Sequence, residues 1–325
     1  MIEVRNLVKK YDNHLALDNL SFTVEENTIF GFLGPNGAGK STTMNIITGY
    51  LAPTSGQVLI NGHDIVEEPV EAKKYIGYLP ELPPVYMDMT PYEYLKFVGQ
   101  AKKIEKSRLQ AEIEKAMEKA SITHVQNRLI KTLSKGYRQR VGMAQAILGD
   151  PKVIILDEPT VGLDPMQIIE FRELVRDLGR EHTVILSSHI LAEISEICQK
   201  IMIISKGNLI AIDTPDNLSH QLEGGSLIAI KVREDDGQRA CDLIRAIEEV
   251  SEVSIVGKDK GMASIEIKGV SGTQQLQEKI SVALMEGKCP VMAIEEKEDT
   301  LEDIFIKILE RQKKQTAEKE GAEEC

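Results

Sequence analysis

The segment GPNGAGKS at residues 34–41 has the residue types and the spacing of a phosphate-binding loop. Its glycines let the backbone curl until successive N–H groups point at phosphate oxygens. Lys40 places a positive charge beside the β and γ phosphates of a triphosphate, and the Ser41 hydroxyl supplies an oxygen for Mg²⁺. An apolar strand precedes the loop and a helix follows it, so the positive end of that helix also faces the phosphates.

The alternative interpretation of this segment is a glycine-rich turn with an accidental GKS. The strand–loop–helix context favours phosphate binding. We predict that the following residues contact the nucleotide: Gly34, Pro35, Asn36, Gly37, Ala38, Gly39, Lys40, Ser41 and Thr42.

Two adjacent acids end the apolar run VIILDE at residues 153–158. With a phosphate loop upstream, Asp157 is expected to hold Mg²⁺ directly or through its waters. Glu158 is then placed to polarise the attacking water as a general base. The alternative is a pair of exposed acids at a strand end, which is a common arrangement.

Composition limits the class of protein. A chain of 325 residues suggests about two domains. No apolar run approaches the roughly 20 residues that span a bilayer, and the start MIEVRNLVKK lacks the apolar core of a signal peptide. We therefore expect a cytoplasmic protein without direct membrane insertion. The net charge of -12 argues against sequence-independent binding of nucleic acid.

The four cysteines form no CxxC pair, so the sequence predicts neither a zinc site nor a redox motif. Isolated, buried cysteines in a reducing compartment are the expectation. The positions are Cys198, Cys241, Cys289 and Cys325.

Hydrophobic periodicity divides the chain into two folded parts. Residues 1 to about 30 alternate as antiparallel strands do, and residues 91–120 and 139–149 have helical periodicity. Alternating strands and helices from 153 to about 205 predict a parallel sheet with covering helices. The first domain is expected to span residues 1–218.

A polar, glycine-bearing hinge is predicted at residues 218–225, after which the pattern restarts. The order β-α-β-β-α-β that follows is the split βαβ, ferredoxin-like arrangement. A last helix, TLEDIFIKILERQ, carries an apolar stripe and is expected to pack on this domain, which spans residues 219–312. Residues 313–325 form a charged tail that is expected to be disordered.

In combination, these motifs resemble those of the ATP-binding cassette (ABC) family. GPNGAGKS resembles its Walker A motif and VIILDE its Walker B motif. LSKGYRQR at 133–140 resembles the family signature LSGGQ, VGLDP at 161–165 the D-loop, and His189 after the strand TVILSS the switch histidine. The resemblance covers about residues 1–218. It implies a P-loop NTPase α/β cassette with a mixed-sheet core, an antiparallel β lobe and a helical lobe at about 88–150.

The resemblance also implies how ATP is held. Two copies of the chain form a head-to-tail dimer, with ATP between the Walker A loop of one copy and the signature of the other. Ser134, Gly136 and Asp164 are then expected at the nucleotide of the partner, and His189 at the γ-phosphate. Tyr11 matches the aromatic residue that stacks on adenine, although an ordinary edge-strand tyrosine is the competing interpretation.

Two departures from the family pattern stand out. In GYLPE, Glu81 occupies the position of the family's magnesium-ligating glutamine, and it adds a negative charge beside the triphosphate. We expect Glu81 to ligate Mg²⁺ and to make the site more dependent on the metal. The alternative is a surface acid in a proline-rich loop. In the signature, Lys135 and Tyr137 replace a Gly and the Gln, and Lys135 either faces phosphate or points to solvent.

The signature variant, GYLPE and the C-terminal extension together resemble the ATP-binding subunits of ABC-2-type exporters. This subgroup implies a separate multi-spanning permease, which would hold the chain at the inner face of the cell membrane. The loop at residues 81–90 would meet that permease, unless it is an ordinary connection between lobes. The extension would hold two cassettes together, bind a regulator or cover an edge of the core. The main alternative is a soluble ABC ATPase of translation or DNA maintenance. A non-hydrolysing nucleotide switch is disfavoured by Glu158 and His189.

Overall fold

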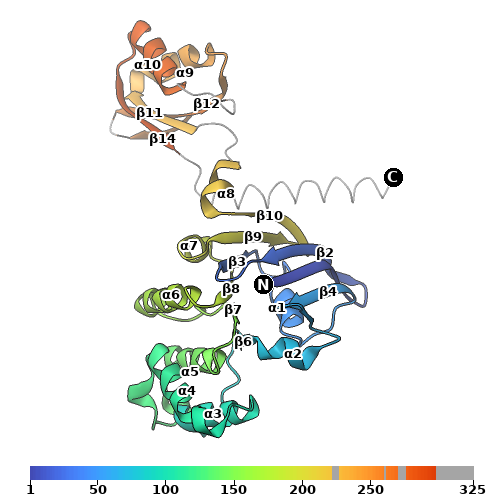
Figure 1. The fold of residues 1–325 in the computed structure, drawn as a ribbon. Coiled ribbons are helices and arrows are strands. Elements are labelled where there is room, and N and C mark those ends of the chain that lie inside the picture. Colours follow the sequence, from blue (N-terminus) through green and yellow to red (C-terminus); the bar gives the residue numbers. More distant parts are fainter. Residues whose placement is uncertain (222–226, 260, 270–275, 298–325) are drawn as a thin grey trace. The chain divides into compact units, whose positions relative to one another are not determined.

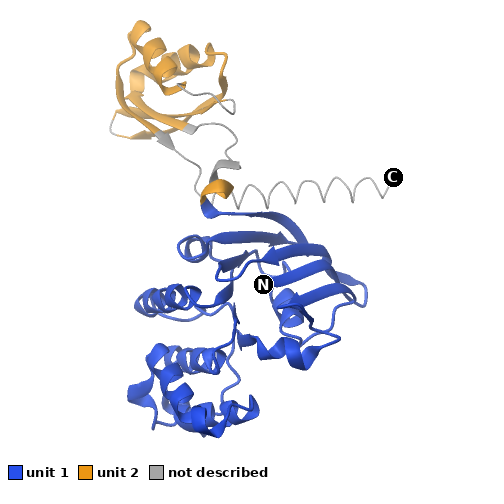
Figure 2. Cartoon of the chain, viewed as in Figure 1, with its two compact units in different colours: residues 1–215 blue, residues 216–325 orange. Residues whose placement is uncertain are grey.

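The computed structural model describes residues 1–221, 227–259, 261–269 and 276–297. The chain divides into two compact units between Pro215 and Asp216 (Figure 2). The predicted last helix, the charged tail and Cys325 lie outside the described residues.

A six-stranded sheet forms the centre of the first unit, in the order β10-β9-β3-β8-β7-β6 (Figure 1). Every neighbouring pair is parallel except β9 and β10, so the predicted parallel sheet is confirmed. Parallel strands end at the same edge, and the loops after β3, β6, β7 and β8 therefore meet there. The strands are β3 (Ile29–Leu33), β6 (Ile76–Leu79), β7 (Val153–Asp157), β8 (Thr183–Ser188), β9 (Lys200–Ser205) and β10 (Asn208–Asp213).

A second, antiparallel sheet in the order β2-β1-β4-β5 forms the N-terminal lobe. Buried side chains of this sheet, of β3 and of α1 share one apolar core. Within it, Phe22 contacts Phe32 edge to face at 5.3 Å between ring centroids. This packing fixes the position of α1, which directly follows the phosphate loop. The elements are β1 (Ile2–Tyr11), β2 (His14–Val24), β4 (Ser55–Ile60), β5 (His63–Asp64), α1 (Lys40–Ile47) and α2 (Pro69–Lys74).

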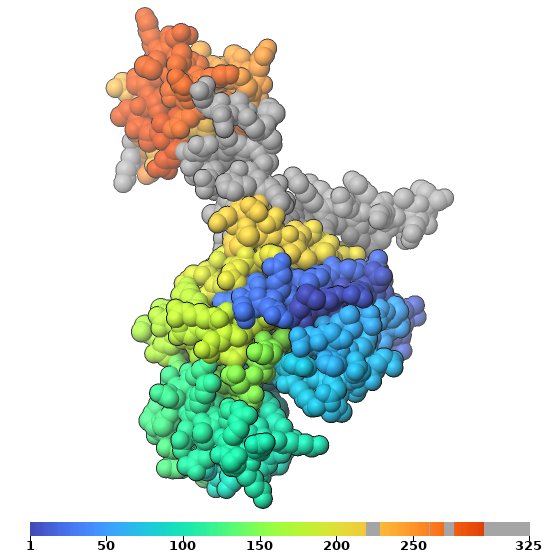
Figure 3. Space-filling model, in the orientation of Figure 1, coloured from blue at the N-terminus to red at the C-terminus, as the bar shows by residue number. Residues whose placement is uncertain are grey.

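Three helices form a separate lobe, seen as the green protrusion of the first unit in Figure 3. They are α3 (Pro91–Ala101), α4 (Lys106–Lys119) and α5 (Lys135–Ile147). Two short 3₁₀ turns, η1 (Thr123–Val125) and η2 (Ile130–Thr132), lie between α4 and α5. The single helical stretch predicted at 91–120 is two helices, because the backbone turns at Lys103, whose φ is 59°. A Cβ on Gly77 of β6 would overlap the carbonyl oxygen of Ala146, so α5 lies directly on the sheet.

Two further helices belong to the first unit, α6 (Pro165–Gly179) and α7 (Leu191–Ser195), and α8 (Pro215–Gln221) begins at the last residue of that unit. The predicted hinge at 218–225 is wrong in its first part, because residues 218–221 belong to α8. Leu218 is buried, so this turn of helix is held by packing.

The second unit contains a four-stranded antiparallel sheet in the order β12-β13-β11-β14. Its element order and strand order are those of the split βαβ arrangement. Apolar side chains of the sheet and of α9 and α10 form one core. The elements are β11 (Leu227–Arg233), η3 (Glu234–Asp236), α9 (Gly237–Arg245), β12 (Val250–Asp259), β13 (Met262–Gly269), α10 (Leu276–Glu286) and β14 (Val291–Lys297).

Two compositional predictions can be compared with the described residues. Cys198, Cys241 and Cys289 are free and buried, as expected. Within the same part of the chain, no helix has both the length and the apolar character needed to cross a membrane.

Candidate functional site

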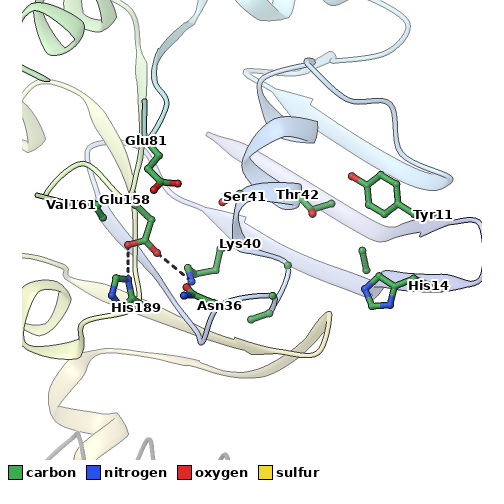
Figure 4. Close-up of a pocket in the computed structure, with 14 residues that line it drawn as sticks. Tyr11, His14, Asn36, Lys40, Ser41, Thr42, Glu81, Glu158, Val161 and His189 are labelled. Carbon is green, nitrogen blue, oxygen red and sulfur yellow. Dashed lines mark hydrogen bonds and ion pairs between the residues drawn. The ribbon is translucent and has the colours of Figure 1, made fainter. Parts of the chain in front are cut away.

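A pocket of about 600 Å³ opens at the edge of the sheet where β3, β6, β7 and β8 end (Figure 4). It brings together predicted residues from five separate parts of the sequence. The lining residues are Tyr11, His14, Ala16, Asn36, Gly37, Ala38, Gly39, Lys40, Ser41, Thr42, Glu81, Glu158, Val161 and His189.

The phosphate loop has the backbone that its glycines permit. Gly39 precedes α1 with a φ of 106°, a backbone conformation that residues other than glycine rarely adopt. Lys40 is buried, and its Nζ donates to the carbonyl oxygens of Gly34 at 2.7 Å and Pro35 at 3.3 Å. The lysine is therefore folded back over its own loop, with its charge beside the pocket.

Glu158 connects the loops that follow three strands. Its Oε1 lies 3.3 Å from Nζ of Lys40, and its Oε2 lies 2.8 Å from Nδ1 of His189. The Glu158 backbone has a φ of 46°, an uncommon conformation that costs about 1–3 kcal/mol for a residue with a side chain. Its backbone N–H donates to Oγ of Ser187 at 2.8 Å, which holds it in place. The strained backbone directs this acid into the pocket.

Asp157 lies beneath the pocket, where two hydroxyl groups donate to its Oδ1. Ser187 does so at 2.6 Å and Ser41 at 3.3 Å. Burial raises the pKa of Asp157, while the hydrogen bonds from Ser187 and Ser41 act in the opposite direction.

The residues around Ser41 suit a magnesium ion. The Ser41 hydroxyl and the Asp157 carboxylate are oxygen donors, which Mg²⁺ prefers, and they lie next to the phosphate loop. Among the residues that the structure describes, no group of three or more His, Cys, Asp or Glu could hold a metal by itself. Mg²⁺ is usually bound through one or two carboxylates, with phosphates and waters as its other ligands, so the residues present fit it.

Tyr11 and His14 lie at the end of the pocket away from Glu158 and His189 (Figure 4). They are paired residues on either side of the β1–β2 turn, and both line the pocket. Sequence reasoning missed His14, although the turn residues Asp12 and Asn13 place it opposite Tyr11. It also missed Ala16 and Val161, whose small apolar side chains carry no chemical signal.

Glu81 lines the pocket from the loop after β6, and Figure 4 shows its carboxylate directed inward. The structure therefore places Glu81 among the pocket residues, at the position that the family's glutamine has in the sequence pattern.

Ser134, Gly136 and Asp164 are not among the residues that line this pocket. Ser134 is the N-cap of α5 and accepts from the Tyr137 N–H at 3.4 Å. Asp164 is the N-cap of α6 and accepts from the Gln167 N–H at 2.9 Å. A Cβ on Gly136 would lie 2.5 Å from Oε1 of Gln167, so the two helix ends touch. They form a second group of predicted residues with two positive helix ends side by side.

The two unusual signature residues have different surroundings. Lys135 is exposed, and its side chain lies against Gly162 in the loop before α6. The Tyr137 hydroxyl lies 2.9 Å from Nε2 of His124, with the two rings edge to face. The Tyr137 side chain is therefore engaged with another residue of the helical lobe.

Comparison with protein families gives a match to the model described as ABC transporter, over residues 17–161. The chain is 42% identical over 215 residues to the ABC transporter ATP-binding protein YhcH of Bacillus subtilis (strain 168), covering 65% of this chain and 69% of that protein. It is 32% identical over 315 residues to the bacitracin transport ATP-binding protein BcrA of Bacillus licheniformis, covering 95% of this chain and 97% of that protein.

Comparison with solved structures gives the same type of protein. One structure of an ATP-binding subunit of an ABC transporter superposes with a TM-score of 0.63 at 29% identity. It covers 68% of this chain and 92% of that chain. The likeness to known cassettes therefore concerns the first unit chiefly, whereas the likeness to BcrA extends over nearly the whole chain.

Burial of Asp157 predicts a gain in stability when its charge is removed. Because burial raises its folded-state pKa, the ionised carboxylate lowers the free energy of unfolding at pH values above that pKa. We expect Asp157→Asn, without nucleotide, to raise the thermal unfolding midpoint at pH 8. The gain should disappear below about pH 4, where the carboxyl is protonated in both states. Measurements of Tm between pH 3 and 8 check this.

The matched control is Asp177→Asn, which removes an exposed acid from α6. It should give no comparable pH-dependent gain. A lower Tm for Asp157→Asn at pH 8 would show that the lost hydrogen bonds outweigh burial.

Proposed function

We propose, from the premise that this chain belongs to the ABC transporter family and is one of its ATP-hydrolysing subunits, that it powers export through a separate ABC-2-type permease. The observation that carries the hydrolytic part is the contact of Glu158 with both Lys40 and His189 in one pocket. A buried acid beside a phosphate-binding lysine and a histidine suits the activation of water for attack on a phosphate.

Each residue of this constellation has a proposed task. The backbone N–H groups of the loop and the Lys40 charge bind the phosphates of ATP. Glu158 polarises the attacking water and accepts its proton, while His189 orients Glu158 and contacts the γ-phosphate. Tyr11 and His14, at the far end of the pocket, offer rings on which adenine can stack.

Mg²⁺ would be held by Ser41, Asp157 and Glu81 together with phosphate oxygens. When bound, it supplies a positive charge that neutralises the phosphates. Asp157 contributes a charged oxygen on a rigid strand end, because Ser187 fixes its orientation.

A second copy would complete the site. Ser134, Gly136 and Asp164 gather at two helix N-termini apart from the pocket residues, where two positive helix ends lie side by side. In a head-to-tail dimer, these ends would face the ATP held by the loop of the partner.

The permease contact is proposed at the loop 81–90 and the adjoining face of α3. Leu82, Tyr86 and Phe97 are all exposed, and the rings of Tyr86 and Phe97 meet edge to face at 5.4 Å. An exposed aromatic cluster of this kind is typical of a protein interaction surface. Attachment to a permease would place the chain at the inner face of the membrane.

We keep the predicted limits of 1–218 for the cassette and 219–312 for the ferredoxin-like domain as part of the proposal, with dimer contact as the role of that domain. The 32% identity to BcrA over both parts supports treating them as one transport subunit.

The partner proposal predicts co-purification of the tagged full-length chain with a multi-spanning membrane protein from detergent-solubilised membranes. Replacing Leu82 and Tyr86 by serine should reduce the recovery of that protein about 10-fold or more, because interface anchors carry most of the binding energy. Replacing the exposed Met166 of α6 by serine is the control and should leave recovery unchanged. Recovery of ribosomes or DNA in place of a membrane protein would instead support the soluble alternative.

The proposed base predicts that Glu158→Gln lowers the ATPase rate by about 10²–10⁴-fold. ATP binding should persist, so an ATP-bound dimer should accumulate. Size-exclusion chromatography with light scattering, with and without ATP, measures this. Glu181→Gln removes an exposed acid far from the pocket and should retain both hydrolysis and the monomer–dimer behaviour of the original chain. A Glu158→Gln variant that hydrolyses ATP at full rate, or stays monomeric with ATP, contradicts the assignment.

Glu81 predicts unusually strong coupling between Mg²⁺ and ATP. Without metal, its negative charge repels the triphosphate, and Mg²⁺ converts this repulsion into ligation. We expect Glu81→Gln to reduce the ratio between ATP affinity with Mg²⁺ and ATP affinity in EDTA by about 5-fold or more. Isothermal titration calorimetry gives both values, with the exposed Glu67→Gln as control. An unchanged ratio would mean that Glu81 does not ligate the metal.

A further inference from the structure

A buried carboxylate lies behind the pocket, outside the residues that line it. Glu193 belongs to the short helix α7 and has an exposed fraction of only 6%. Its Oε2 accepts two hydrogen bonds, from Oγ1 of Thr160 at 2.7 Å and from Oγ of Ser188 at 3.1 Å. Both hydroxyl groups are themselves buried. Hydrogen bonds to a carboxylate are about twice as strong as those between neutral groups.

The two donors lie beside the two proposed catalytic residues in the sequence. Thr160 follows Glu158 by two residues in the loop after β7, and Ser188 is the last residue of β8, directly before His189. Ser188 also accepts from the backbone N–H of Ile190 at 3.0 Å. The residues on both sides of His189 are therefore hydrogen-bonded to each other through the Ser188 hydroxyl, which in turn donates to Glu193.

The sheet does not provide this connection. The parallel ladder between β7 and β8 has its last pair at Asp157 and Ser187, so the two strands are no longer paired with each other at Glu158 and His189. Ser188 still pairs with Leu33 of β3, on the other side of β8. Beyond that pair, the loops are joined by the contact of His189 with Glu158 in front and by Glu193 behind. The front contact lines the pocket, whereas the rear contact is buried behind it.

We infer that Glu193 is a positioning residue for ATP hydrolysis, which holds the loop of His189 against the loop of Glu158. The inference rests on the proposed roles of those two residues. Small displacements of reacting groups have large effects on rate, so loss of this buried link should slow the chemical step more than it weakens ATP binding. Glu193 itself is not among the residues that line the pocket.

The first test compares Glu193→Ala with Glu193→Gln in the full-length chain. Glu193→Ala removes both hydrogen bonds, and we expect kcat to fall about 10-fold, as for other residues that orient a catalytic group. The Kd for ATP should change by less than about 2-fold, since no pocket residue is lost. Glu193→Gln keeps an acceptor oxygen at the same place and should recover most of the rate. A purely structural role would lower binding and rate together and would not distinguish the two variants in this way.

The matched control is Glu196→Ala, at the end of the same helix. Glu196 is exposed and pairs with Arg172 and Arg176 of α6, away from the pocket. Its removal should leave kcat unchanged. If Glu193→Ala does not fold, Ser188→Ala and Thr160→Val each remove one donor and should show the same fall in kcat at constant Kd.

The second test asks whether Glu193 acts through His189. Single-turnover rates are measured for His189→Ala, Glu193→Ala and the double variant. We expect the double variant to be no slower than His189→Ala alone. The inference is overturned if Glu193→Ala slows the His189→Ala variant by the same factor as it slows the original chain. It is also overturned if Glu193→Ala lowers ATP affinity and rate by the same factor. A full rate for His189→Ala overturns the proposed role of His189 instead, and the inference with it.

Discussion

The functional site depends on one buried carboxylate that is shared by two positively polarised partners. Glu158 contacts Lys40 through one oxygen and His189 through the other, at 3.3 and 2.8 Å. These three residues come from loops after β3, β7 and β8, which are neighbours in the sheet. A charge in a buried place is costly unless it is paired and hydrogen-bonded, so the contacts keep the three loops together. The same arrangement prepares the site for phosphate, because Lys40 can exchange its carboxylate partner for a phosphate oxygen.

The rest of the first unit serves to hold these loops at the sheet edge. Ser187 connects the neighbouring segments: its hydroxyl donates to Asp157 and accepts from the Glu158 N–H, and it belongs to the strand that leads to His189. Behind it, Ser188 and Glu193 form a further buried layer. Such layers of hydroxyl groups and carboxylates have defined hydrogen-bond geometry, which apolar packing alone does not impose. The site is thus supported from behind by side chains that do not touch the nucleotide.

The predicted residues form two separate groups in the structure: those that line the pocket, and Ser134, Gly136 and Asp164, which lie outside it. Ser134 and Asp164 cap α5 and α6, and the helix ends touch through Gly136 and Gln167. The helical lobe is tied to the sheet by the close approach of Gly77 to Ala146. Movement of this lobe would therefore carry the signature residues as one body and would also be felt at β6, the strand before Glu81. This continuity would connect the proposed partner surface at the 81–90 loop with the pocket.

Much of the site was predictable from the sequence by itself, because its chemistry is written in short contiguous segments. The phosphate loop needs glycines, a lysine and a serine in fixed order, and a buried strand ending in Asp157 and Glu158 is locally recognisable. The parallel sheet and the Ser134 cap were predictable for the same local reason. Only the tertiary structure decided that His14 lines the pocket together with Tyr11, that Lys135 lies on Gly162, that α8 continues into the predicted hinge and that Glu193 joins Thr160 to Ser188. These contacts join residues whose meeting depends on strand order, loop paths and packing, and hydrophobic periodicity carries no information on which loops become neighbours.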